Sequence, residues 1–461
     1  MRENPLGTQT IPKLLTKMAV PSVIANLVNA LYNVVDQIFI GHTIGYSGNA
    51  ATNIAFPLTT LCLAIGLMTG LGAAAGFNLE LGRGDREQSR RFAGTAFSSL
   101  WISGVVIAVA VRLSLDPLML AFGGSNASPE IMRYVTEYAG ITSLGIPFLL
   151  FSVGAAPLVR GDGSPGYSMA ALVTGSAVNI GLDALFMLVF GMGMRGAAWA
   201  TVIGQAICAG MLAIYFLRFK NVKIAPRDLV PNIRVLGRIL ALGFSSFAFQ
   251  SSTLLIQITV NNLLGKYGDL SIYGSDVTIA AAGILQKLNA IFIAMVIGVV
   301  QGAQPILSYN YGAKKFHRVR KTVRLSLIVT TSIAVSMFLL MQLFPGQIVG
   351  LFGGGSKLYF EFAVIFARGF MLCTFLNGAQ IFCATFFPAI GKAAKGAIIS
   401  LSKQLAFLLP LLLLLPRFFG IYGVIYAAPV SDTLAFLLAG GMLLFELKAM
   451  PKEDQSVPEK N

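Results

Sequence analysis

The stretch "GLGAAAGFNLELGRGDREQSRR" (70–91) has a counterpart about 230 residues later in the same chain. The counterpart is "VQGAQPILSYNYGAKKFHRVRK" (300–321), which also passes from an apolar run with small residues into a basic segment. The matched glycines are Gly72 with Gly302 and Gly82 with Gly312. The similarity predicts that the chain contains two copies of one structural unit.

A second pair of stretches keeps nearly the same spacing. "GMRGAAWATVIGQ" (193–205) aligns with "GIYGVIYAAPVSD" (420–432), and each copy has two glycines three residues apart. Two separated matches in nearly constant register indicate two halves that run in parallel, with an even number of membrane spans in each. Repeated halves of this kind are typical of alternating access around a central cavity.

The composition places both halves in a membrane. Hydrophobic residues make up 56% of the chain and charged residues only 11%, whereas soluble domains carry roughly 25% charged residues. The net charge of +15 comes from basic residues in short segments between apolar runs. This pattern is expected from membrane topology, so we expect no nucleic-acid partner.

About twelve apolar runs are long enough to cross a bilayer. The sequence therefore predicts an all-α integral membrane protein of twelve transmembrane helices in two six-helix bundles. The predicted parts are an N-terminal bundle (1–217), a cytoplasmic linker (218–235), a C-terminal bundle (236–447) and a polar C-terminal tail (448–461). The later runs include 358–388 and 394–416, and several of the twelve runs are long enough to tilt or bend. The basic segments place both termini in the cytoplasm.

Two acidic residues interrupt the apolar runs of the first half. Asp36 ends a polar stripe on the first predicted helix, and Asp183 lies within "SAVNIGLDALFMLVF" (176–190) with Asn179 one turn before it. Helix rise places Asp36, Asp183 and Thr201 at a similar depth, roughly 7 to 11 Å from the outer ends of their helices. A carboxylate costs roughly 2.5 to 3.5 kcal/mol inside a bilayer, so such residues face the bundle interior and mark ion paths.

The chemistry of this cluster leaves two coupling ions open. Neighbouring carboxylates in a site of low polarity favour holding a proton. Amide and hydroxyl oxygens added to them would equally suit Na⁺. A third interpretation is that Asp36 and Asp183 only hold helices together through hydrogen bonds.

Four stretches resemble the multidrug and toxic compound extrusion (MATE) family over nearly the whole chain. They are "LYNVVDQIFIGH" (31–42), "VNIGLDALF" (178–186), "GAAWATVIGQ" (196–205) and "QGAQPILSYNYGAKK" (301–315). The resemblance implies two bundles related by a pseudo-twofold axis and arranged as a V. It also implies antiport, in which organic, mostly cationic and aromatic compounds leave in exchange for H⁺ or Na⁺, with no cofactor.

The chain is most similar to the prokaryotic branch of the family that has its coupling site in the N-terminal half. That resemblance implies a cation site of Asp36, Asn179, Asp183 and Thr201, and a hinge at Pro21 in the first helix. It implies the inner membrane of a prokaryote as the location, and we expect the protein to work as a monomer. Other branches carry acids in helices 7 and 10, where this chain has neutral residues.

Neutral polar and aromatic side chains could line a cavity for the exported compound. Amides and rings suit aromatic cations through hydrogen bonds and cation–π contacts, although ordinary helix packing would also explain them. The candidates are Tyr32, Asn33, Gln250, Gln257, Asn377 and Gln380.

Three basic residues in the second half require a separate explanation. Lys287, Arg368 and Lys403 are predicted to lie near the middle of the membrane, where each needs a counter-charge. An ion pair between Lys403 and Asp432 is the structural interpretation. An open basic site would instead suit a flippase for lipid-linked oligosaccharides, which is the alternative function. A membrane-embedded transferase is less well supported, because the sequence shows no nucleophile with its base and no transition-metal motif, and we expect no enzyme activity. A passive channel is also less well supported.

Overall fold

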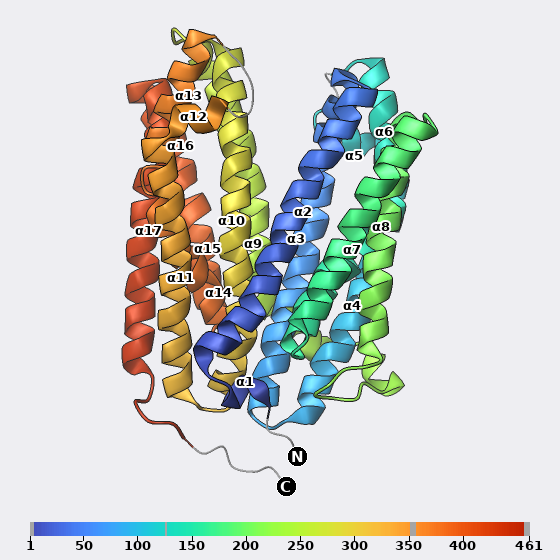
Figure 1. The fold of residues 1–461 in the computed structure, drawn as a ribbon, viewed down its shortest axis with the longest axis vertical. Helices are drawn as coiled ribbons and strands as arrows, with labels where there is room; N and C mark the ends of the chain where they lie inside the picture. Colours follow the sequence, from blue (N-terminus) through green and yellow to red (C-terminus); the bar gives the residue numbers. More distant parts are fainter. Residues whose placement is uncertain (1–3, 125–126, 351–355, 456–461) are drawn as a thin grey trace.

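The computed structural model describes residues 4–124, 127–350 and 356–455, and no β-strand occurs in these ranges. The helices form two bundles that approach each other at the end carrying both termini and diverge at the other end, as in a V (Figure 1). The N-terminal bundle contains α1 (Pro5–Thr8), α2 (Ile11–Thr43), α3 (Tyr46–Gly82), α4 (Arg86–Leu113), α5 (Leu115–Ala121), α6 (Pro129–Gly161), α7 (Pro165–Asp183), η2 (Ala184–Val189) and α8 (Gly193–Phe216).

A segment with one short 3₁₀ helix, η3 (Pro226–Leu229), joins the bundles. The second bundle then contains α9 (Ile233–Asp269), α10 (Ser275–Gly312), α11 (Phe316–Leu343), α12 (Pro345–Gly350), α13 (Lys357–Phe370), α14 (Thr374–Ala389), α15 (Ala393–Leu401), η4 (Ser402–Leu408), α16 (Leu409–Phe419) and α17 (Ile421–Ala449). The last six residues of the predicted C-terminal tail, 456–461, lie outside the described residues.

Within the described ranges, eleven helices are long and apolar enough to cross a membrane, and α13 with α14 makes a twelfth span bent by 49°. The predicted fold class is confirmed, and the span predicted over 358–388 consists of two helices, α13 and α14, that meet at this bend. At the break the N–H of Leu372 donates to Gly369, so the carbonyl of Arg368 lacks its helical partner. The side chain of Gln342 on α11 donates to that carbonyl at 2.9 Å, and this bond compensates for the interruption.

Glycines allow the two bundles to meet backbone against backbone. A Cβ atom on Gly72 of α3 would overlap the backbone of α9, and one on Gly302 of α10 would overlap the backbone of α2 at Ala19. Gly82 and Gly312 lie where α3 and α10 cross, and each faces a backbone carbonyl of the other helix. The glycines matched by the internal repeat therefore occupy corresponding positions in the contact between the bundles.

Substituting one of these glycines should weaken the contact. Gly312→Val inserts a branched side chain against the carbonyl of Leu79, and such overpacking costs about 1 to 3 kcal/mol. We expect the bundles to separate at the end that carries the termini. Distances between spin labels on α3 and α10 at that end would measure the separation. Gly441→Val is the matched control, because a Cβ there meets nothing within 4 Å; equal distances in both variants would contradict the prediction.

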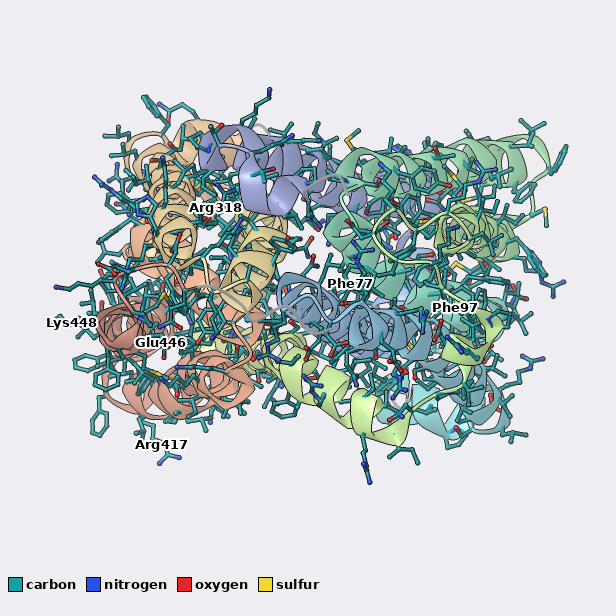
Figure 2. All side chains as sticks on the ribbon, turned by 90° about the horizontal axis from the view of Figure 1, so that it is seen from below. Phe77, Phe97, Arg318, Arg417, Glu446 and Lys448 are labelled. Carbon is teal, nitrogen blue, oxygen red and sulfur yellow. The ribbon has the colours of Figure 1, made fainter. Side chains whose placement is uncertain are left out.

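The first described residues close the V at its base. Arg318 of α11 donates to the carbonyls of Leu6 and Gln9, at 3.1 and 2.7 Å. Asn310 at the end of α10 donates to Leu6 at 2.9 Å. Seen from this end, Arg318 and Glu446 lie in one bundle and Phe77 in the other (Figure 2). The N-terminal segment is thus fixed to the C-terminal bundle.

Candidate functional site

The two acidic residues of the first half meet inside the N-terminal bundle, where α2 packs against α7 (Figure 1). The side chains of Asp36 and Asp183 are 7% and 0% exposed. The two carboxyl groups are neighbours in one buried site. Two carboxylates that are close together repel each other, and a proton held by one of them would relieve this repulsion.

The predicted amide and hydroxyl groups complete one side of this site. Asn179 lies one turn before Asp183 on α7 and is buried. Its Nδ2 donates to Oγ1 of Thr201 on α8 at 3.4 Å, so its Oδ1 remains available to the site. The structure therefore brings together all four residues that the sequence assigned to the cation site.

Acceptor atoms without donors mark the centre of the site. Within the described part of the chain, no donor reaches Oδ1 of Asp36, either carboxylate oxygen of Asp183, or Oδ1 of Asn179. Buried polar atoms are rarely left without a partner, and each one costs about 1 to 3 kcal/mol, more when the group is charged. A cluster of oxygen acceptors with no donor is suited to hold a proton or a hard cation.

The sequence analysis missed Tyr138 of α6. Its side chain lies among the residues of the site and has Thr201, Asp36 and Tyr32 as neighbours. A depth estimate could have found this residue. Tyr138 follows the start of α6 by about 13 Å of helix rise and Thr201 follows the start of α8 by about 12 Å, so both lie at one level.

A π-helix begins directly after Asp183. Residues Ala184–Val189 form η2, in which the N–H of Phe190 donates to the carbonyl of Leu185, five residues earlier. π-Helical turns are rare and occur frequently at functional sites. The sequence predicted an ordinary helix through this stretch, because a change of hydrogen-bond register leaves no pattern of side-chain types.

The remaining candidates on α2 differ in how far their side chains are buried. Tyr32 is half-buried and lies near Asn33 and Asp36. Asn33 is exposed and donates to the carbonyl of Asn29 on its own helix at 2.7 Å. α2 continues as one helix through Pro21, which is half-buried.

The cavity candidates of the second half differ in exposure. Gln257 of α9 is exposed and Gln250 is half-buried. Gln380 of α14 is 3% exposed, and no donor in the described part reaches its Oε1. Asn377 is engaged elsewhere: its Oδ1 accepts from Lys403 at 2.6 Å, and its Nδ2 donates to Asp432 at 3.2 Å.

Lys403 and Asp432 form an ion pair inside the C-terminal bundle. The Nζ of Lys403 lies 2.9 Å from Oδ1 of Asp432, and both side chains are largely buried. Lys403 lies in η4, a second π-helix, so both halves have a π-helix in their fifth span. Lys287 and Arg368, for which the sequence also predicted counter-charges, are both exposed. Neither has a carboxylate within ion-pair distance among the described residues.

Comparison with known proteins assigns the family. The sequence model of the MatE family matches residues 21–185 and 242–412, which together are most of the chain. The chain belongs to the MatE family. Members of this family are transporters and not enzymes, so this MatE protein is a multi-pass membrane transporter, as the sequence predicted.

Individual relatives and solved structures match this chain over nearly their full length. The multidrug export protein MepA of Staphylococcus haemolyticus (strain JCSC1435) is 25% identical over 433 residues, 93% of this MatE chain and 92% of that protein. The solved structure of the MATE multidrug transporter DinF-BH in complex with a dye is 32% identical, with a TM-score of 0.87 and coverage of 95% and 97%. A MOP superfamily transporter from Pyrococcus furiosus Vc1 (DSM3638) is 21% identical and has a TM-score of 0.89, with coverage of 98% and 99%.

Removing the Tyr138 hydroxyl should impair the site without destroying it. Tyr138→Phe deletes the group near Thr201 and keeps the ring, and one neutral hydrogen bond contributes about 0.5 to 1.5 kcal/mol. We expect transport to slow by roughly threefold to tenfold, with unchanged protein yield. Tyr134→Phe, one turn earlier on α6, is the matched control. Initial transport rates in vesicles measure both, and an equal rate for Tyr138→Phe and the unaltered protein would contradict the role.

Proposed function

We propose that this MatE protein exports organic, mostly cationic and aromatic compounds by antiport against H⁺ or Na⁺. The observation that carries the proposal is the group of buried oxygen acceptors on Asp36, Asn179 and Asp183, which have no donor in the described residues. A proton between the two carboxyl groups, or a Na⁺ ion among the oxygens, would satisfy them. The coupling cation is thus a substrate of the exchange.

The position of the acidic site on α2 would link cation binding to movement of the helices. Asp36 belongs to α2, which packs against α7 of its own bundle and against α10 of the other. A cation at Asp36 and Asp183 would change how α2 packs on α7, and bending at Pro21 would let the outer part of α2 follow. The requirement is differential: the cation and the exported compound must favour different conformations or compete for the same carboxylates.

The orientation follows from the basic segments. With both termini in the cytoplasm, the V in Figure 1 opens to the outside, and this conformation would take up the cation and release the compound. The inner membrane of a prokaryote supplies the driving force. When one H⁺ or Na⁺ exchanges for one singly charged compound, no net charge crosses the membrane, so the concentration gradient of the coupling ion drives the exchange, and a tenfold gradient contributes about 1.4 kcal/mol. A monomer that moves one cation per cycle could then maintain about a tenfold gradient of the compound.

The names of the relatives support the class of exported compound. MepA is a multidrug export protein, and DinF-BH is a multidrug transporter that was solved in complex with a dye. In this chain, Tyr32, Asn33, Gln250 and Gln257 are at least partly exposed and are the side chains we expect to contact the compound. Lys403 is neutralised by Asp432, so the basic site that a flippase would need lacks one of its three predicted members.

Transport by the purified protein in vesicles tests the proposal. Vesicles loaded with a fluorescent organic cation would receive an imposed pH gradient, an imposed Na⁺ gradient, or neither. We expect one gradient, with the cation entering as the compound leaves, to accelerate efflux by at least about tenfold. Efflux that responds to neither gradient would overturn antiport. Movement of a lipid-linked oligosaccharide in place of the organic cation would support the flippase.

A further inference from the structure

A cavity lies beside α2 at the end of the molecule that carries the termini, and none of its lining residues belongs to the proposed cation site. It has a volume of about 590 Å³ and is lined by α2, the first turn of α7, the last turn of α8 and the residues that follow. Three of its lining side chains are basic: Lys17, Arg218 and Lys220. They come from separate parts of the sequence, and only the fold brings them together.

The positive charge of this cavity is not neutralised by ion pairs. None of the three basic side chains has a carboxylate within 4.0 Å in the part of the chain that the structure describes. Asp162 is the nearby acid, but it is 1% exposed and already accepts hydrogen bonds. Its donors are the Tyr215 hydroxyl at 2.9 Å, the Lys220 N–H at 2.6 Å, and the N–H and Nδ2 of Asn221 at 3.0 and 2.9 Å.

The start of α7 adds partial positive charge to the same wall. Gly166 and Tyr167 line the cavity and belong to the first turn, whose N–H groups have no helical partner. The hydroxyl of Ser164 does not cap them; it forms a hydrogen bond with the Tyr215 hydroxyl at 2.7 Å. These groups strengthen an anion site that the three basic side chains define.

The surface next to the cavity is apolar. On α2, Val20 and Ile24 lie one and two turns beyond Lys17 and are 49% and 41% exposed. Ile214, in the last turn of α8 and four residues before Arg218, is 53% exposed. Both helices therefore change from basic to apolar in the direction of the membrane interior. This order matches a molecule with an anionic head and hydrocarbon chains.

We infer that this cavity binds the phosphate-bearing headgroup of an anionic phospholipid from the adjacent leaflet. The phosphate would lie among Lys17, Arg218 and Lys220, and the acyl chains would lie along Val20, Ile24 and Ile214. Pro21 also lines the cavity, so a bound headgroup would contact α2 at its proline. The bound lipid would then favour one bend of α2, which makes this a site of regulation by membrane composition.

Lipid binding to the full-length protein in neutral detergent tests the inference without requiring transport. Native mass spectrometry would measure binding of dioctanoyl phosphatidylglycerol, dioctanoyl phosphatidylcholine and inorganic phosphate separately. The test variant is Lys17→Gln/Arg218→Gln/Lys220→Gln. All three side chains are exposed, and the Lys220 bond to Asp162 uses the backbone, so folding should be preserved. Elution as a single species in size-exclusion chromatography would check this.

The matched control removes the same number and kinds of charge outside the cavity: Lys321→Gln/Lys448→Gln/Arg227→Gln. These residues are also exposed and lack ion pairs among the described residues. Each basic residue near an anionic surface contributes about a factor of five. We therefore expect the test variant to bind phosphatidylglycerol roughly 100-fold more weakly and the control to bind it within about twofold of the unaltered protein.

Three results would overturn the inference. Equal losses in the test and control variants would mean that only the total charge matters. Equal binding of phosphatidylcholine and phosphatidylglycerol would mean that the cavity does not recognise net negative charge. Inorganic phosphate that binds as tightly as phosphatidylglycerol would identify a site for a free anion instead of a lipid.

Discussion

Asp183→Asn is expected to abolish gradient-driven export while leaving the protein folded in the membrane. The asparagine keeps the size of the side chain and can donate to Asp36, but it cannot hold a proton or supply the negative charge that a cation needs. Asp183 is fully buried beside Asp36, so solvent cannot replace the lost charge. We expect the initial rate of gradient-driven transport to fall by at least about 100-fold, since one charged contact in such a site contributes about 3 kcal/mol.

The measurement is efflux from vesicles under the gradient that drives the unaltered protein. Asp36→Asn should give the same loss, because both carboxylates form one site and the effect of removing both should be no larger. Asp116→Asn is the matched control, since Asp116 is an exposed acid on α5. Full coupled transport by Asp183→Asn, with an unchanged response to the gradient, would show that the coupling cation binds elsewhere.

Lys403→Met is expected to destabilise the C-terminal bundle strongly. Methionine has nearly the same length as lysine but leaves Asp432 buried with the amide of Asn377 as its one remaining partner among the described residues. Breaking a buried ion pair on one side typically costs about 3 to 5 kcal/mol. Unfolding of the purified protein in mixed detergent micelles would measure the loss.

A second substitution separates the ion pair from simple packing. Lys403→Met/Asp432→Asn removes both charges and keeps a hydrogen-bonding group beside Asn377, so most of the stability should return. Lys287→Met is the control, because that lysine is exposed and has no carboxylate partner among the described residues. If the single and double variants unfold alike, the charge on Asp432 is not the cause of the loss.

The internal repeat predicted the arrangement of the bundles because the matched glycines serve a backbone contact that tolerates no side chain. Gly82 and Gly312 lie where α3 crosses α10. Any side chain at either position would overlap the facing backbone, so both copies of the repeat have glycine there. The acidic site was predictable for a similar reason. A carboxylate in an apolar run is costly, and helix rise alone places Asp36, Asp183 and Thr201 at one level.

Other features leave weaker traces in the sequence. The π-helices η2 and η4 are shifts of backbone hydrogen bonds, which many side chains tolerate. The break after α13 depends on a bond from Gln342 of another helix, so its cause lies far away along the chain. Tyr138 was missed because an isolated tyrosine in an apolar helix is usually a packing residue.

The glycine contacts between the bundles also affect how the transporter can move. Interlocked side chains would have to disengage before two helices could slide, and each such step adds a barrier. Where Gly72 and Gly302 bring main chain against main chain, no side chains interlock between the facing helices. We therefore expect a low energy barrier to movement of one bundle against the other, so events at the acidic site would set the speed of each cycle.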